Sequence, residues 1–243
     1  MRFLRWVLGA SILLSGCGAL GSSGDIIGYP NIDIGADSVE VFKSTDERDL
    51  HLHIFRPDDS LQGDRGAVLF FHGGGFATTR VEQFERQAQL LADAGIVGIV
   101  VEFRVTAEGT TRSDAIEDGA DALDFVVTHA ASLAIDPQRV AMAGASAGGA
   151  LATEASPGTS ALVLFNPAVN ASSAGFAGDV PSITFHSRED TVIPFSSAEG
   201  FCDAAADCEL IAFDEGDHGF FNNEPAFTET TNAMIEFLRS QGW

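Results

Sequence analysis

From residue 38 onward, short apolar runs alternate with segments in which apolar residues recur at helical spacing. This alternation is typical of a mostly parallel sheet covered by helices on both faces, because parallel strands need a long crossover between them. The apolar runs predict strands at 39–43, 50–56, 67–71, 96–103, 139–143, 161–165, 182–186 and 209–213. We therefore expect one α/β domain over 38–243, with about eight strands and an antiparallel opening pair.

The helical segments fall between these runs, and their ends carry local signals. Helices are expected at 81–94, 113–132, 147–155, 199–206 and 224–239. Ser113 is expected to cap the second of them, because serine accepts hydrogen bonds from the free amides of a first turn. No stretch among these elements is long enough for a large additional domain or cap over the sheet.

The first 37 residues follow a different pattern. Two arginines precede the apolar stretch 6–14, and small residues then lead to Leu14-Ser15-Gly16-Cys17, which resembles the bacterial lipobox. We expect 1–17 to be a lipoprotein signal peptide ending at Cys17, and 18–37 to be a Gly/Ser-rich tether. An ordinary signal peptide with a chance cysteine is the alternative. The lipoprotein interpretation predicts an exported protein, held at the cell envelope only through its lipidated terminus.

The charge balance restricts the possible partners. Against 35 acidic residues the chain has 13 basic ones, for a formal net charge of −22, and Lys43 is its single lysine. Nucleic acid is therefore excluded as an expected partner, because binding to it depends on clustered positive charge.

Two cysteines remain once Cys17 is assigned to lipid. Cys202 and Cys208 lie six positions apart in a chain that we expect to enter an oxidising compartment. We predict a disulfide between them, with two buried free thiols as the alternative.

The strongest chemical signal is Gly144-Ala145-Ser146-Ala147-Gly148, which follows a predicted strand and opens a predicted helix. A serine nucleophile in a strand-turn-helix elbow needs this context, because the sharp turn lifts its hydroxyl clear of the sheet. Small neighbours are required because larger side chains would collide with the adjoining strand and helix. Ser146 is therefore the candidate nucleophile.

A glycine run follows an earlier predicted strand, in His72-Gly73-Gly74-Gly75-Phe76. Attack on an ester carbonyl produces an oxyanion, which backbone amides can stabilise if they are aimed at it in advance. Consecutive glycines let the main chain approach that closely. We expect the amides of Gly74 and Gly75, with that of Ala147 at the elbow, to form the oxyanion hole.

Serine also needs a base that a carboxylate orients. In a strand-turn-helix hydrolase the chain order is Ser, then Asp or Glu, then His. His218 follows the last predicted strand and is the candidate base, and Asp190 follows the strand ending at His186. The competing acids are Glu189, Asp179 and Asp217.

The other histidines receive structural interpretations. His51 and His53 alternate with apolar residues, so we expect a solvated strand face rather than a metal pair. His72 is expected to hold its loop by hydrogen bonds, His186 to pack near the acid loop, and His129 to lie at the surface. No metal and no cofactor are expected.

Together these motifs resemble two branches of the α/β-hydrolases: the hormone-sensitive-lipase-type esterases and the bacterial feruloyl and acetyl-xylan esterases. The resemblance rests on the glycine run, the elbow, Glu102-Phe103-Arg104, the Asp190 segment ending in Val192-Ile193-Pro194, and His218-Gly219-Phe220-Phe221. It implies an α/β-hydrolase fold without a large cap and a triad of Ser146, Asp190 and His218. Ala145 and Ser187 depart from residues common in these branches.

The expected function is that of a serine carboxylic ester hydrolase working through an acyl-enzyme. We expect short-chain acyl or aryl esters as substrates, either small esters or acetylated or feruloylated polysaccharide. A peptidase of the same fold is one alternative. A catalytically silent surface-binding lipoprotein built on the same scaffold is another.

Overall fold

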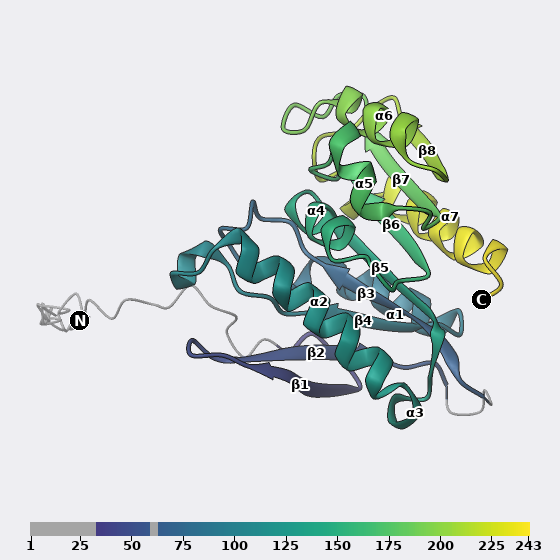
Figure 1. Ribbon diagram of the computed structural model, residues 1–243. Helices are drawn as coiled ribbons and strands as arrows, with labels where there is room; N and C mark the ends of the chain where they lie inside the picture. The colour runs from purple at the N-terminus through teal and green to yellow at the C-terminus, as the bar shows by residue number, and fades with distance from the viewer. Residues whose placement is uncertain (1–32, 59–62) are drawn as a thin grey trace, which may run out of the picture.

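The computed structural model describes residues 33–58 and 63–243 (Figure 1), and the predicted sheet is present in them. The described residues form one eight-stranded sheet in the order β1-β2-β4-β3-β5-β6-β7-β8. Only β1 against β2 and β2 against β4 pair antiparallel, so the predicted antiparallel opening pair is confirmed. The strands are β1 Ser38–Ser44, β2 Asp49–Phe55, β3 Arg65–Phe71, β4 Val97–Val101, β5 Ile135–Ala145, β6 Ala161–Phe165, β7 Ser182–Ser187 and β8 Cys208–Phe213.

Helices cover both faces of the sheet (Figure 1), as the alternating pattern predicts. The first core packs the helices α2 to α6 on one face, and the second packs η1, α1, η4 and α7 on the other. The helices are η1 Val81–Phe84, α1 Glu85–Asp93, η2 Thr106–Glu108, α2 Arg112–Thr128, α3 Ala130–Leu133, α4 Ala147–Glu154, η3 Ala171–Ser173, α5 Ala174–Ala177, α6 Phe195–Ala204, η4 Phe220–Asn222 and α7 Ala226–Ser240. The central strands are therefore buried on both sides, which explains why β3, β4 and β6 are almost continuously apolar.

The structure corrects the cap of α2. The helix begins at Arg112, and its cap is Thr111 rather than Ser113. The Thr111 hydroxyl accepts a hydrogen bond from the Asp114 amide, and the Asp114 carboxylate accepts one from the Thr111 amide. This reciprocal capping box satisfies two backbone donors, which a cap at Ser113 would leave unpaired.

Helical bounds also differ from the prediction. The segment expected as one helix over 113–132 is broken at His129 into α2 and α3. Helix α6 begins at Phe195, directly after Pro194, instead of at Glu199. Its first turns place Ala198 and Phe201 in the core, and its N-cap residue is Pro194.

Six of the described strands end at the same edge of the sheet because they run parallel. Their last residues are Phe71, Val101, Ala145, Phe165, Ser187 and Phe213. The glycine run, the elbow, and the segments that carry Asp190 and His218 all follow these ends. Ligand sites of open α/β sheets form at this edge, so the topology brings the predicted site residues together.

The expected signal peptide 1–17 and lipidated Cys17 lie outside the described residues, as does most of the expected tether 18–37. The described end of that tether is not separate from the domain. Ile34 is buried against the second core, and the Asp37 amide donates a hydrogen bond to the Ile54 carbonyl. None of the helices in 33–58 and 63–243 is long and apolar enough to cross a bilayer.

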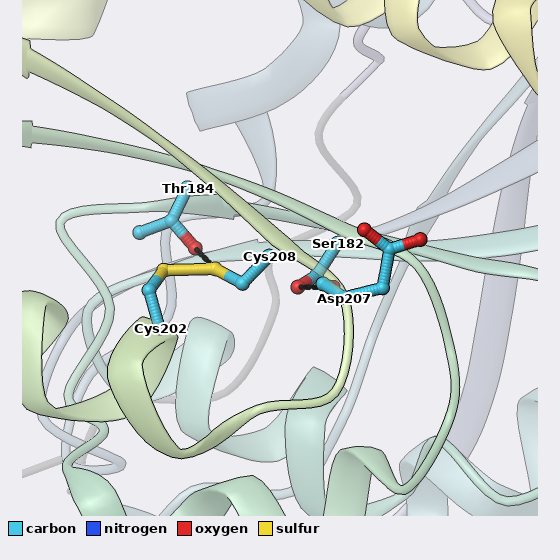
Figure 2. The surroundings of a disulfide bond; sticks show 5 residues. All are labelled: Ser182, Thr184, Cys202, Asp207 and Cys208. Atoms are coloured by element: carbon cyan, nitrogen blue, oxygen red, sulfur yellow. Dashed lines mark hydrogen bonds between the residues drawn. A yellow bond between two sulfur atoms is a disulfide. The ribbon is translucent and has the colours of Figure 1, made fainter.

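Cys202 in α6 and Cys208 at the start of β8 form a disulfide, with sulfur atoms 2.00 Å apart (Figure 2). The Thr184 hydroxyl lies 3.7 Å from the Cys208 sulfur, so the bond packs against the neighbouring strand β7. The bridge ties the end of a surface helix to the strand at the edge of the sheet.

Replacing both cysteines with serine should lower the free energy of unfolding by about 2 kcal/mol, because a short closed loop restricts the unfolded chain only moderately. Urea denaturation of the full chain under oxidising conditions measures the change. Wild type in excess reductant should match the double variant. Equal stability of all three samples would show that the bridge contributes nothing.

Candidate active site

Ser146 occupies a strained turn between β5 and α4. Its backbone has φ 52° and ψ −118°, a region that residues with a side chain rarely adopt. Three backbone hydrogen bonds hold it there: the Ser146 amide donates to the Phe165 carbonyl, and the Ser146 carbonyl accepts from the amides of Ala150 and Ala168. Such strain persists only where the surroundings enforce it, and it is common at reacting groups.

The glycines around Ser146 are required by close backbone contacts. A Cβ atom on Gly144 would overlap the carbonyl oxygen of Gly148, and one on Gly148 would overlap the carbonyl oxygens of Phe71 and His72. Helix α4 therefore starts directly against the end of β3. This contact brings the elbow and the glycine run side by side, and a Cβ atom on Gly73 would lie 3.4 Å from that of Ser146.

His218 and Asp190 form a hydrogen-bonded pair. The distance between His218 Nδ1 and Asp190 Oδ2 is 2.6 Å, and the Asp190 side chain is fully buried. The other carboxylate oxygen, Oδ1, accepts hydrogen bonds from the amides of Val192 and Ile193, at 2.8 and 3.0 Å. These amides fix the carboxylate, so that Oδ2 can orient the imidazole with Nε2 left for a reacting group.

Of the four candidate acids, the structure brings only Asp190 to His218. Asp217 instead accepts a hydrogen bond from the Gly219 amide and closes the turn around His218. Glu189 donates its amide to the Ser187 hydroxyl, and its side chain is exposed. Asp179 lies in the loop between α5 and β7.

Ser146 and His218 line one cavity of about 380 Å³ at the carboxyl edge of the sheet. Its walls come from the glycine run, the elbow and the His218 loop, and they include Gly74, Gly75, Val192 and Phe221. A second cavity, of about 500 Å³, lies between the segment at Ile34, α1 and α7, and contains none of these residues. The smaller cavity is therefore the candidate active site.

The glycine run has a backbone conformation that requires glycine at two positions. Gly74 and Gly75 have φ values of 119° and 65°, which side-chain-bearing residues rarely adopt. The Gly74 carbonyl accepts hydrogen bonds from the amides of Ala77 and Thr78, closing the loop. Ala147 is the first residue of α4, where amides have no partner within the helix.

Gln83 was not singled out by sequence. Its side-chain oxygen accepts a hydrogen bond of 2.7 Å from the Gly73 amide. Gln83 therefore anchors the glycine run at its first glycine. Nothing in the sequence distinguishes this glutamine from the other polar residues around 81–94.

Asn166 was also missed, although its position carried a signal. It directly follows β6 at the edge where the site forms, and it is fully buried. Its side-chain nitrogen donates to the His218 carbonyl at 2.9 Å, and its oxygen accepts from the Ser187 amide at 3.2 Å. The asparagine thereby ties the loop of the base to the strand that precedes the acid.

His72 lies at the start of the glycine run. Its Nδ1 forms a hydrogen bond with the Gly73 carbonyl, and its ring stacks on Phe103 with centroids 4.3 Å apart. Burial lowers the pKa of His72 to about 4, although the Gly73 carbonyl acts in the opposite direction. A neutral, buried His72 fits the structural role that the sequence suggested.

The expectation of a solvated face for His51 and His53 is wrong for His53. The His53 side chain is buried, and both imidazoles form hydrogen bonds with the Glu102 carboxylate, at 3.1 Å from His51 and 2.9 Å from His53. Arg48 pairs with the same carboxylate at 2.6 Å. Burial acts to raise the pKa of Glu102, but the two histidines and Arg48 outweigh it and hold the pKa below its usual value.

The remaining histidines lie where expected. His186 is buried beside the acid loop, with Nε2 2.9 Å from the Ile193 carbonyl and 3.4 Å from Asp190 Oδ2. Burial lowers the pKa of His186, which favours its neutral form. His129 is exposed, and its Nδ1 lies 2.9 Å from the Phe125 carbonyl.

Within the described ranges, no group of three or more His, Cys, Asp or Glu side chains is placed to hold a metal ion.

Comparison with known proteins identifies relatives of this architecture. An ethyl acetate hydrolase of Pseudomonas putida is 36% identical over 112 residues, which are 44% of this chain and 34% of that protein. The neuroligin-like protein glit-1 of Caenorhabditis elegans is 35% identical over 114 residues, or 43% of this chain and 15% of that protein. The chain thus matches about a third or less of the length of these curated relatives.

A solved structure is similar over nearly its whole length. The propionate-bound esterase Est2 of Thermogutta terrifontis superposes with a TM-score of 0.80 at 28% identity, covering 87% of this chain and 96% of that one. A family model described as the alpha/beta hydrolase fold matches residues 68–207, from β3 through the elbow and the Asp190 segment. The chain therefore belongs to the alpha/beta hydrolase family, as its motifs indicated.

Proposed function

We propose that the chain is a serine carboxylic ester hydrolase in which Ser146, His218 and Asp190 form the triad. The observation that carries this proposal is the 2.6 Å pair of His218 and buried Asp190 at the cavity that Ser146 lines. A serine hydroxyl is a weak nucleophile until a base takes its proton, and a carboxylate behind the base stabilises the charged imidazole that forms. The strained elbow supports the same assignment.

The reaction runs in two halves. Ser146 Oγ attacks the ester carbonyl carbon while His218 Nε2 takes the hydroxyl proton, and the carbonyl oxygen becomes an oxyanion. The amides of Gly74, Gly75 and Ala147 stabilise this charge. The intermediate then expels the alcohol, which receives the proton from His218, and leaves the acyl group on Ser146. A water molecule, deprotonated by His218, releases the acid and restores the serine.

Short acyl groups are the proposed substrates, on small esters or on acetylated or feruloylated polysaccharide. The cavity measures about 380 Å³, near the lower end of the usual range for ligand sites, which suits a small ester. Two similar proteins support this choice: one is an ethyl acetate hydrolase, and the other, Est2, has a structure with propionate bound. The competing functions are those of a peptidase and of a catalytically silent binding protein. The substrate panel includes the second alternative because one relative is a neuroligin-like protein.

A substrate panel tests the proposal. The full chain should hydrolyse p-nitrophenyl acetate and p-nitrophenyl butyrate, with the acetate or butyrate preferred over the decanoate at least about tenfold, because each methylene that the pocket cannot hold costs binding energy. Alanine p-nitroanilide should give no turnover. Hydrolysis of the anilide but not the esters would favour the peptidase, and no turnover of any substrate would favour the silent scaffold.

The same proposal places the enzyme at the cell envelope, anchored by lipid on Cys17. The charged, apolar and small-residue segments before this cysteine support it. Expression of the full chain in a bacterial host with labelled palmitate should label wild type and not Cys17→Ser. Label on both proteins, or on neither, would contradict the anchor while leaving the hydrolase proposal intact.

A further inference from the structure

Arg80 lies at the candidate active site, although it has no role in the proposed two-step reaction. It lies directly before η1, at the end of the loop that begins with the glycine run. Its side chain is exposed, and it lines the same cavity as Ser146 and His218. Its backbone carbonyl accepts a hydrogen bond from the Gln83 amide, so the residue sits on an ordered turn.

The charges at this cavity differ from those of the rest of the molecule. The chain has a net charge of −22, yet no acidic side chain lines the cavity, and Arg80 and His218 are the two lining residues with ionisable side chains. Asp190 is buried and bonded to His218, and the Asp217 carboxylate accepts a hydrogen bond from the Gly219 amide. Among the residues that line the cavity, Arg80 therefore carries the one permanent charge, and this charge is positive.

Arg80 also differs from most arginines of the structure. Six others form ion pairs with carboxylates: Arg48, Arg86, Arg104, Arg112, Arg139 and Arg188. Among the described residues, no carboxylate pairs with the Arg80 guanidinium. The side chain that anchors the glycine run is Gln83, so Arg80 is not needed to hold the loop.

We propose that Arg80 is an anion subsite that binds a carboxylate carried by the ester substrate. The inference rests on the proposed function and narrows its substrates to esters that bear a carboxylate on the acyl or the alcohol part. A guanidinium suits this task because its planar donors match the two oxygens of a carboxylate. In a protein of strong negative charge, a free cation at the mouth also offsets the repulsion that such a substrate meets on approach.

Two matched substrate pairs test the subsite with the full chain. On the alcohol side, 4-acetoxybenzoate is compared with the neutral 4-acetoxybenzamide. On the acyl side, monomethyl adipate is compared with methyl hexanoate, followed by titration of the released acid. The readout is the ratio of kcat/KM between the charged and the neutral member of each pair, at low and at high salt.

In Arg80→Gln this ratio should fall by about tenfold for at least one pair, with a raised KM for the charged ester, because the lost contact is a charge-assisted hydrogen bond. Arg80→Lys should keep part of the preference, since the charge remains without the planar fork. High salt should lower the wild-type ratio. Arg239→Gln removes an exposed positive charge at the end of α7 and serves as the matched control, with the ratio unchanged.

Two results would overturn the inference. One of them leaves the hydrolase proposal intact, and the other overturns that proposal as well. If both ratios stay within about twofold of wild type in Arg80→Gln, the subsite is wrong while the hydrolase proposal stands. If wild type hydrolyses neither neutral nor charged esters, the proposed function fails and the subsite fails with it. A fall in the ratio on one side alone assigns the carboxylate to that part of the ester.

Discussion

Ser146→Ala should lower kcat for p-nitrophenyl acetate by at least about 10⁴-fold, because the variant has no oxygen to form the acyl-enzyme. The oxyanion amides and the cavity remain, so some residual hydrolysis by water is expected. Alanine keeps the Cβ atom, and the strained backbone at φ 52° is therefore no worse in the variant than in wild type. The thermal midpoint should stay within a few degrees of wild type.

Ser132→Ala is the matched control for this substitution. Ser132 is exposed in α3, away from the carboxyl edge of the sheet, and its hydroxyl donates to the His129 carbonyl. The control should retain full kcat. Retention of more than about a hundredth of wild-type activity in Ser146→Ala would remove Ser146 from the mechanism.

Asp190→Asn should lower kcat by about 10³ to 10⁴-fold. The asparagine oxygen can still accept from the amides of Val192 and Ile193, so the loop keeps its shape. Its nitrogen would then face the imidazole and favour the tautomer with a proton on Nε2, which cannot take the proton of Ser146. The loss should therefore lie in kcat, with KM and stability little changed.

The competing acids provide the controls for Asp190. Asp217→Asn keeps an oxygen for the Gly219 amide, and Glu189→Gln changes an exposed side chain. Both variants should stay within about threefold of wild-type kcat, because the carboxylate bonded to the His218 imidazole is that of Asp190. A large loss in Asp217→Asn together with a small one in Asp190→Asn would transfer the role of the acid to Asp217.

The sequence predicted the sheet well because its signals are local and strong. Buried parallel strands are continuous apolar runs, and β6 was predicted with its observed bounds of Ala161–Phe165. The elbow was also visible, since Gly144 and Gly148 are fixed by backbone contacts that no other residue allows. The predicted topology then placed the site residues together, because parallel strands bring their carboxyl ends to one edge of the sheet.

The errors come from contacts that no local pattern contains. His53 alternates with apolar residues as a solvated histidine would. It is nevertheless buried, because its imidazole is hydrogen-bonded to Glu102, which follows the end of the neighbouring strand β4. Helix α2 ends at Thr128 although the apolar pattern continues, because α3 turns away to bury Ala130 and Leu133. Gln83 acts through one long-range hydrogen bond, and such bonds leave no mark in the sequence around them.

The most direct test of the account is the covalent intermediate itself. Full-length wild type is treated with a fluorophosphonate probe until esterase activity is lost, and the adduct is located by intact mass and peptide mapping. The account predicts one adduct per chain, on Ser146, and none in Ser146→Ala. An adduct on another residue, or loss of activity with Ser146 unmodified, would contradict it.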